Sequence, residues 1–251
     1  MSAREWALII FTIFGQMSVG AFVVLGPVHF FAVRKAGAEE ADRLSDRALL
    51  AIGPVLVLGM LASLFHLGTP LNAYRSIANF ETSWLSREIL FGVLFAVLGG
   101  GFAIMQWRKL GSFALRNVIA LVTAVVGLAL VYSMSQVYAL PTQPAWDTWT
   151  TPISFFVTTF LLGSLAMGAA FVANSAVLKN RADANYEVQQ NLLRDSLRWI
   201  SLASILLLGA ELIIAPLYIA NLAASSNTAL ESVKLMVGEM SLVLILRLVF
   251  V

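Results

Sequence analysis

The chain has 251 residues, of which 59% are hydrophobic and only 12% are charged, compared with roughly 25% charged residues in a typical soluble domain. A mean hydropathy of +0.85 and a net charge of only +2 exclude a soluble globular domain and argue against a nucleic-acid partner. The absence of cysteine excludes disulfides and thiolate-bound iron–sulfur clusters within this chain.

Long apolar runs dominate the sequence, and several exceed 18 residues without the alternation typical of barrel strands. They predict an all-α, polytopic transmembrane bundle that forms a single domain over residues 1–251. The first run has no small-residue cleavage site, so we expect it to be a retained span. The seven expected spans cover about 6–32, 48–66, 87–107, 116–139, 152–178, 198–221 and 233–251.

The distribution of Lys and Arg predicts the orientation of the bundle. Of the 16 Lys and Arg residues, eleven lie in the bridges after the first, third and fifth spans. Four lie in the amino-terminal tail and the other bridges, and Arg247 lies in the last span. The bias places the amino terminus on the outer face and turns the bridge after the second span to the same face. We expect this face to be the periplasmic side of a bacterial inner membrane.

The stretch 61–92 concentrates ionisable residues between two apolar runs. It contains His66, which is followed by Leu-Gly-Thr-Pro, and the Ser-Arg-Glu sequence that ends at Glu88. We expect Ser86 to cap the next helix and Glu88 to lie in its first turn, where the helix dipole favours a carboxylate. A quinol needs hydrogen-bond partners and a group that takes its protons. A cation or proton site would have a similar pattern.

Other polar residues within apolar runs are candidates for a proton path, because charged groups are costly in hydrocarbon. Glu211 and Glu239 lie in the expected sixth and seventh spans. His29 lies near the inner end of the first span, and the rise of a helix separates it in depth from His66 by roughly 25–30 Å. The two histidines therefore cannot share a haem. We interpret His29 as an interfacial residue and expect no metal site.

Tryptophan and small residues have simpler interpretations. All six tryptophans lie near expected span ends, as in an aromatic belt. Trp84, Trp146 and Trp149 share the outer face, where they could also line a ligand mouth. Ser164 and Gly168 form a small-xxx-small pair, which allows helices to pack closely.

Five segments resemble the membrane-anchor subunits of dimethyl sulfoxide reductase-type molybdoenzymes. They are EWALIIFTIFGQMSVGAF, SLFHLGTPLNAYRSI, SWLSREILFG, WDTWTTPISFF and the GAEL at 209–212. The resemblance implies a haem-free anchor, itself a non-catalytic subunit, that binds menaquinol or ubiquinol. Its partners would be a four-cluster iron–sulfur subunit and a catalytic subunit holding molybdenum bis-pterin. The family has eight spans, so an eighth is expected after residue 251.

The resemblance also assigns roles to residues. It implicates His66 and Glu88 in quinol binding and oxidation, and related anchors also serve complexes that run in the opposite direction. Arg75, Arg87 and Trp84 are expected to support the head group or the partner. The alternatives are a secondary transporter or ion channel, for which we find no inverted repeat, and a structural anchor without a quinone site.

Overall fold

The computed structural model describes residues 3–66, 75, 77–179, 186–225 and 227–250, and every regular element in these ranges is a helix. The central unit is an antiparallel hairpin of α1 (Ala3–Ala36) and α2 (Ala38–His66). Gly37 turns the backbone between them with a φ of 86°, and its amide donates to the Val33 carbonyl over 2.9 Å. A glycine is favoured at such a left-handed position because it has no Cβ.

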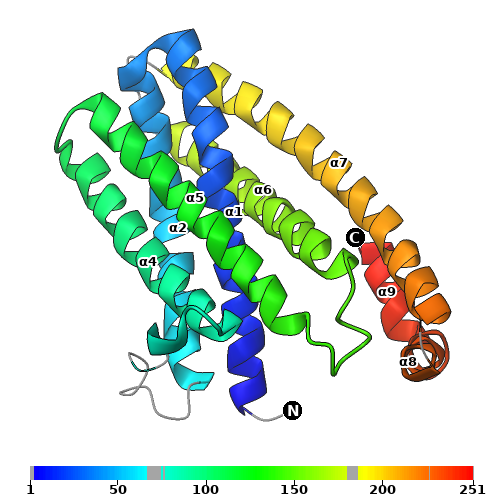
Figure 1. Cartoon of the computed structure of the whole chain (residues 1–251). Coiled ribbons are helices and arrows are strands. Elements are labelled where there is room, and N and C mark those ends of the chain that lie inside the picture. Colours follow the sequence, from blue (N-terminus) through cyan, green and yellow to red (C-terminus); the bar gives the residue numbers. More distant parts are fainter. Residues whose placement is uncertain (1–2, 67–74, 76, 180–185, 226, 251) are drawn as a thin grey trace.

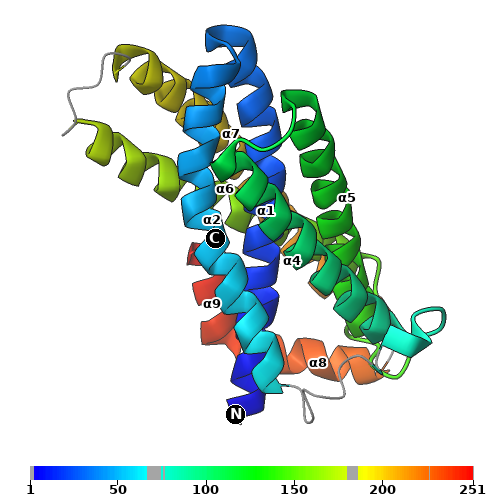
Figure 2. The same ribbon diagram turned by 90° about the vertical axis from the view of Figure 1, so that its left-hand side faces the viewer.

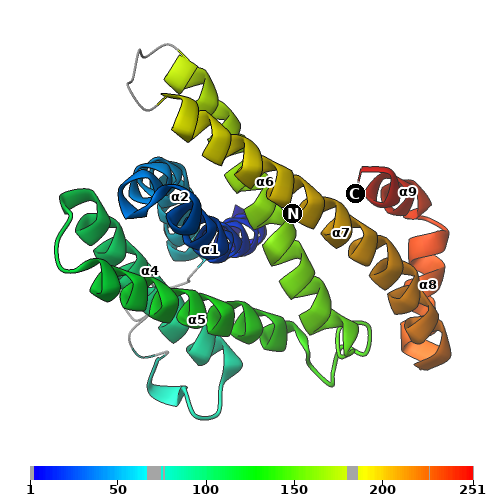
Figure 3. The same ribbon diagram turned by 90° about the horizontal axis from the view of Figure 1, so that it is seen from above.

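Two further helix pairs flank this hairpin (Figures 1 and 3). One pair packs as α4 against α5 and the other as α6 against α7, while α1 contacts α2, α5 and α6. The remaining short elements are a 3-10 turn and two helices near the end of the sequence. The bounds are η2 (Ile77–Asn79), α4 (Trp84–Arg108), α5 (Phe113–Tyr138), α6 (Thr150–Lys179), α7 (Tyr186–Ser225), α8 (Asn227–Val237) and α9 (Ser241–Phe250).

The prediction of an all-α membrane bundle is confirmed. Among the described residues, five helices are long and apolar enough to cross a membrane: α1 from Trp6, α4, α5, α6 to Ser175, and α7 to Ala224. Helix α2 covers the expected span 48–66 but begins ten residues earlier, and α7 begins at Tyr186 rather than at 198. Hydropathy detects only the apolar part of each helix, whereas the additional turns carry charged residues that pair with neighbouring helices.

The seventh expected span, 233–251, is wrong as a single helix. Helix α8 ends at Val237, a turn follows, and α9 begins at Ser241. The amide of Met240 donates to the Leu235 carbonyl over 2.8 Å, which closes the helical ladder before the turn. At 1.5 Å per residue, pieces of 11 and 10 residues are each about 15 Å long, half the hydrocarbon thickness of a bilayer. Helix α8 lies across the end of the bundle (Figure 2).

A close crossing joins α1 to α6 through two glycines. A Cβ added to Gly20 would lie 1.9 Å from the carbonyl oxygen of Thr159, and one added to Gly163 would lie 2.1 Å from the carbonyl carbon of Gly20. The expected small pair lies next to this crossing, since Ser164 is buried. Gly168 instead faces Ile200 of α7, with 3.6 Å between its added Cβ and the Ile200 Cγ2. Both members of the pair therefore serve packing.

Candidate functional site

The structure describes only part of the bridge that the sequence singles out. Helix α2 ends at His66, whose side chain lies outside the described residues, as do residues 67–74 and 76. Arg75 is described and exposed. The expected roles of His66 and Arg75 therefore stay predictions. Helix α2 ends at His66. This end of α2 lies at the same end of the bundle as the start of α1 and the start of α4 (Figure 1).

Glu88 is a buried carboxylate near the start of α4. The helix begins at Trp84, and the Ser83 hydroxyl caps it by accepting from the Ser86 amide over 3.3 Å. The expected cap at Ser86 is thus wrong, because α4 begins earlier than its apolar run. Glu88 is consequently the fifth residue of the helix, in its second turn rather than its first, and is 8% exposed. Burial, rather than the terminal dipole, dominates its surroundings, because the dipole effect falls off within one turn.

The nearest hydroxyl that the structure relates to this carboxylate is that of Tyr138. The Tyr138 hydroxyl, at the end of α5, lies beside the Thr12 hydroxyl of α1 and within electrostatic range of Glu88. Aromatic rings fix the position of Tyr138, with centroids of Trp146 at 5.6 Å and Phe155 at 5.5 Å. A buried carboxylate with a tyrosine hydroxyl in its vicinity can exchange protons and hydrogen bonds with a hydroxyl-bearing ligand.

The predicted supporting residues Arg87 and Trp84 lie in the first turn of α4 and contact each other. Arg87 donates from Nε to the Phe80 carbonyl over 2.8 Å and from Nη2 to the Glu81 carbonyl over 2.6 Å. Its guanidinium lies 4.1 Å from the centroid of the Trp84 ring. Arg87 therefore fixes the turn that precedes α4, and so positions the helix that carries Glu88.

The two carboxylates of the expected proton path have different surroundings. Glu211 is buried on α7, whereas Glu239 is exposed in the turn between α8 and α9. The expected position of Glu239 inside a membrane helix is wrong, because the helix is interrupted at Gly238. The predicted arrangement of these two carboxylates in neighbouring spans is therefore absent from the described residues.

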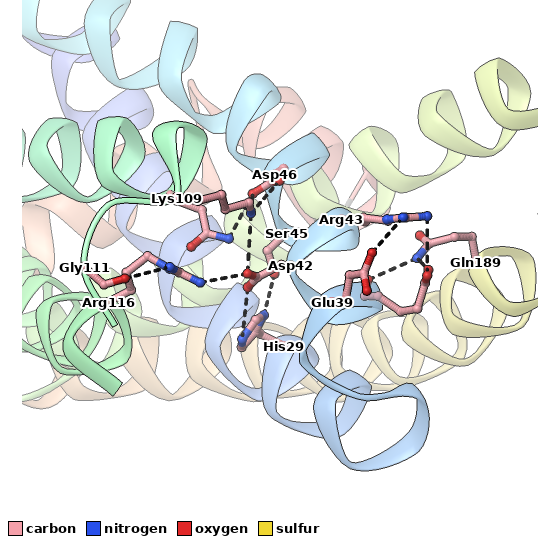
Figure 4. A network of polar contacts seen from close by, with 12 residues as sticks. His29, Glu39, Asp42, Arg43, Ser45, Asp46, Lys109, Gly111, Arg116 and Gln189 are labelled. Carbon is pink, nitrogen blue, oxygen red and sulfur yellow. Dashed lines mark hydrogen bonds and ion pairs between the residues drawn. The ribbon is translucent and has the colours of Figure 1, made fainter. Parts of the chain in front are cut away.

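A second polar cluster, which we call the Asp42 network, lies at the opposite end of the hairpin (Figure 4). Asp42 is buried and accepts from Arg116 Nη2 over 2.9 Å, and Lys109 Nζ lies 3.5 Å away. Lys109 also pairs with Asp46 over 2.9 Å, and the Gln106 amide donates to Asp46 over 2.9 Å. The network therefore ties α2 to the end of α4 and the start of α5.

His29 extends this network to α1, and a neighbouring contact of Glu40 joins α2 to α7. The His29 Nδ1 lies 2.7 Å from the Ser45 Oγ, and its Nε2 lies 4.0 Å from Asp42 Oδ1. Glu40 accepts from the side chain of Gln189. Since Ser45 and His66 are 21 residues apart on one helix, the helical rise separates the two histidine-bearing ends by about 30 Å. His29 is thus a half-buried member of a polar cluster, and its predicted place at the membrane interface stays a prediction.

Sequence reasoning missed Tyr138, Thr12 and the Asp42 network. It interpreted Lys109 and Arg116 only as markers of the inner face. Their partners lie more than 60 residues away in the sequence, so no local pattern could have paired them. Among the described residues, no group of three or more His, Cys, Asp or Glu could hold a metal ion.

Several long apolar helices, with polar clusters buried at both ends, define a multi-pass helical membrane protein. Residues 1–250 match the family described as DMSO reductase anchor subunit (DmsC), and the chain belongs to this family. The expected family is therefore confirmed, and with it a membrane-anchor subunit of an oxidoreductase complex.

Individual relatives agree with this assignment. The protein is 37% identical to an anaerobic dimethyl sulfoxide reductase chain of Escherichia coli K12 over 165 residues, which span 64% of its own length and 56% of the relative. It is 34% identical to a second such chain of that organism, YnfH, over 66% and 57% of the two lengths. It is 28% identical to a sulfite dehydrogenase subunit of Allochromatium vinosum, over 61% and 49%. The protein thus spans about half the length of these relatives. No solved structure matches it.

Proposed function

We propose that this protein exchanges electrons between membrane quinol and a separate iron–sulfur subunit of a molybdoenzyme complex, at a site formed by Glu88 and His66. The observation that carries the proposal is the burial of Glu88 in the second turn of α4, with Tyr138 of α5 within electrostatic range of it. Helix α2 brings His66 to the same end of the bundle (Figure 1). Membership of an anchor family favours this function over a transporter or channel.

The proposed chemistry follows from the groups available. A quinol loses two electrons and two protons when it becomes a quinone, so its two hydroxyls need proton acceptors. Glu88 accepts one proton, the His66 imidazole accepts the other, and Tyr138 orients the ring oxygen. The electrons pass to an iron–sulfur cluster of the partner. The reverse sequence reduces quinone, and the relative named a sulfite dehydrogenase subunit is consistent with anchors that work in that direction.

The partners and location belong to the same proposal. We infer a four-cluster iron–sulfur subunit and a catalytic subunit with molybdenum bis-pterin, both on the periplasmic face of the bacterial inner membrane. The quinol is menaquinol or ubiquinol. The bias of Lys and Arg supports this orientation, because the Asp42 network lies at the basic, cytoplasmic end and Glu88 lies at the other.

The test is the rate at which a short-chain naphthoquinol reduces the redox centres of the partner subunits in the purified complex. Glu88→Gln removes the proton acceptor but keeps the size of the side chain. We expect a fall of about a hundredfold, in the range that general base catalysis contributes. Tyr138→Phe removes one orienting hydroxyl, and we expect a smaller fall, of about tenfold.

Matched controls keep this test specific. Glu231→Gln changes an exposed carboxylate on α8 that pairs with Lys234 over 2.6 Å, and should leave the rate unchanged. Reduction of the same centres by a soluble dye should be unaffected in every variant. A wild-type rate in both Glu88→Gln and His66→Ala would show that quinol reacts elsewhere.

A further inference from the structure

A long pocket lies between α1, α2, α4 and α5, at the end of the bundle that contains the Asp42 network. Its volume is about 730 Å³, within the range of roughly 300–1,000 Å³ typical of sites for small organic ligands. On α5 its wall runs from Phe113 to Leu128, which the helical rise converts to about 22 Å. On α1 the wall runs from Phe22 to Val33, or about 16 Å. The pocket therefore has the length for a chain-like molecule that lies along the helices.

The two ends of this pocket differ in polarity. Its polar wall residues gather at the end next to the Asp42 network, and they are His29, Ser45, Gln106 and Asn117. Towards the middle of the bundle the wall is apolar on both helices, with Phe22 and Val23 on α1 and Val125 and Leu128 on α5. Such a gradient suits an amphiphile, because the head and the tail then each lie among side chains of matching polarity.

Arg34 provides a positive charge at the polar end of the pocket. It is exposed, and its guanidinium lies 4.8 Å from the centroid of the Phe30 ring, which forms part of the wall. The two cations of the Asp42 network are paired with carboxylates, and the neighbouring Lys35 pairs with Asp195. Among the residues that the structure describes, Arg34 has no carboxylate partner. The charge that remains for a ligand favours an anionic head, and a guanidinium matches a phosphate in particular.

The α5 wall of the pocket lies at the depth of the lipid tails. Helix α5 is long and apolar enough to cross a membrane, and its 26 residues extend over about 39 Å, about 9 Å more than the hydrocarbon layer. Leu121 lies about 12 Å beyond Phe113 along the helix, so it is inside this layer in every placement in which α5 spans it. Leu121 and Val125 line the pocket and are 66% and 58% exposed. A lipid tail can therefore enter from the side.

We propose that this pocket binds an anionic phospholipid of the surrounding membrane, with its phosphate at Arg34 and one acyl tail between α1 and α5. Gln106 of the pocket and Glu88 are 18 residues apart on α4, so the helical rise separates the lipid from the Glu88 site by about 27 Å. The lipid site does not depend on the reaction at Glu88. A zwitterionic phospholipid supplies the same tail but brings a second positive charge close to Arg34, so it binds more weakly.

The experiment is native mass spectrometry of the full complex, released from bilayer nanodiscs that contain phosphatidylglycerol and phosphatidylcholine in equal amounts. We expect the wild type to retain phosphatidylglycerol in preference to phosphatidylcholine. Arg34→Gln should lower this preference by about fivefold, the effect of one basic residue near anionic lipid. Ala124→Phe fills the pocket from α5 and should lower the retention of both lipids by about tenfold.

Matched variants separate this site from a general attraction between cations and the membrane. Arg108→Gln removes another exposed arginine that lies over an aromatic ring, 5.2 Å from the Trp107 centroid, but that arginine does not line the pocket. It should leave the preference unchanged. Val122→Phe adds bulk to an exposed position of α5 outside the pocket and should leave the retention of both lipids unchanged.

Three results would overturn the proposal. Equal losses in Arg34→Gln and Arg108→Gln would show a diffuse belt of cations rather than a site. Full retention of lipid in Ala124→Phe would show that the tail lies outside the pocket. Equal retention of both lipids by the wild type would show an acyl-tail site without selection of the head group.

Discussion

The variant Gly163→Ala is expected to separate α1 from α6 and to lower the free energy of unfolding by about 3 kcal/mol or more. The added Cβ would lie 2.1 Å from the carbonyl carbon of Gly20, 2.5 Å from the Cα of that glycine and 2.4 Å from the amide nitrogen of Ala21. These are backbone atoms, which cannot rotate away as side-chain atoms do. The helices must move apart, and the cost of overpacking a tight core is typically about 1–3 kcal/mol and occasionally larger.

The measurement is chemical denaturation of the detergent-solubilised protein, with the amount found in membranes as a second readout. Gly101→Ala is the matched control, because no atom lies within 4 Å of a Cβ added there. That control should be neutral or slightly stabilising, since alanine is favoured over glycine in a helix by up to about 1 kcal/mol. The pair Gly20→Ala and Gly163→Ala should cost less together than the sum of the two. Equal losses in Gly163→Ala and Gly101→Ala would refute the crossing.

The variant Asp42→Asn is expected to destabilise the protein by about 3–5 kcal/mol, the range found when one member of a buried ion pair is removed. Asp42 and Arg116 are 9% and 7% exposed, so the substitution leaves the guanidinium buried without its carboxylate. Lys109 loses one of its two carboxylate partners at the same time. The effect is stronger than for a surface pair because water cannot replace the lost partner.

A double variant tests whether the loss comes from the unpaired charge. Asp42→Asn combined with Arg116→Gln removes both charges, and we expect it to recover part of the stability that Asp42→Asn loses. The control is Lys35→Met, which breaks the exposed pair of Lys35 with Asp195 and should change stability by no more than about 1 kcal/mol. The measurement is the denaturation midpoint of the wild type, Asp42→Asn, the double variant and Lys35→Met. A double variant that is less stable than Asp42→Asn alone would contradict this account.

The helices were predictable because a bilayer leaves the backbone few choices. A spanning segment must satisfy its own backbone and needs about 20 apolar residues, which hydropathy detects directly. The same criterion failed at the seventh span, since hydropathy averages over a local turn. The turn at Gly238, where the glycine amide donates to the Lys234 carbonyl over 2.8 Å, interrupts a stretch whose mean remains apolar.

The candidate site was predictable only in part, because its residues lie far apart in the sequence. Glu88 stands out because a carboxylate interrupts an apolar run. Tyr138 does not stand out, since tyrosine is common near the ends of membrane helices. Tyr138 comes near Glu88 only because α5 packs against α4. A contact between two helices cannot be inferred from a local sequence pattern. Arg116 was missed for the same reason, because its carboxylate partner lies on another helix.

The described ion pairs between helices lie at the Asp42 end of the bundle, so the two ends differ in how strongly their helices are held together. At the Asp42 end, charged and polar side chains hold α1, α2, α5 and α7 together. The contacts described at the Glu88 end include ring pairs and the hydrogen bonds of Arg87 to backbone carbonyls, which separate at lower cost than buried ion pairs. The two ends of the bundle therefore differ in the kind of contact that holds them together. We therefore expect amide hydrogens near Glu88 to exchange with solvent before those near Asp42, which hydrogen-exchange measurements can check.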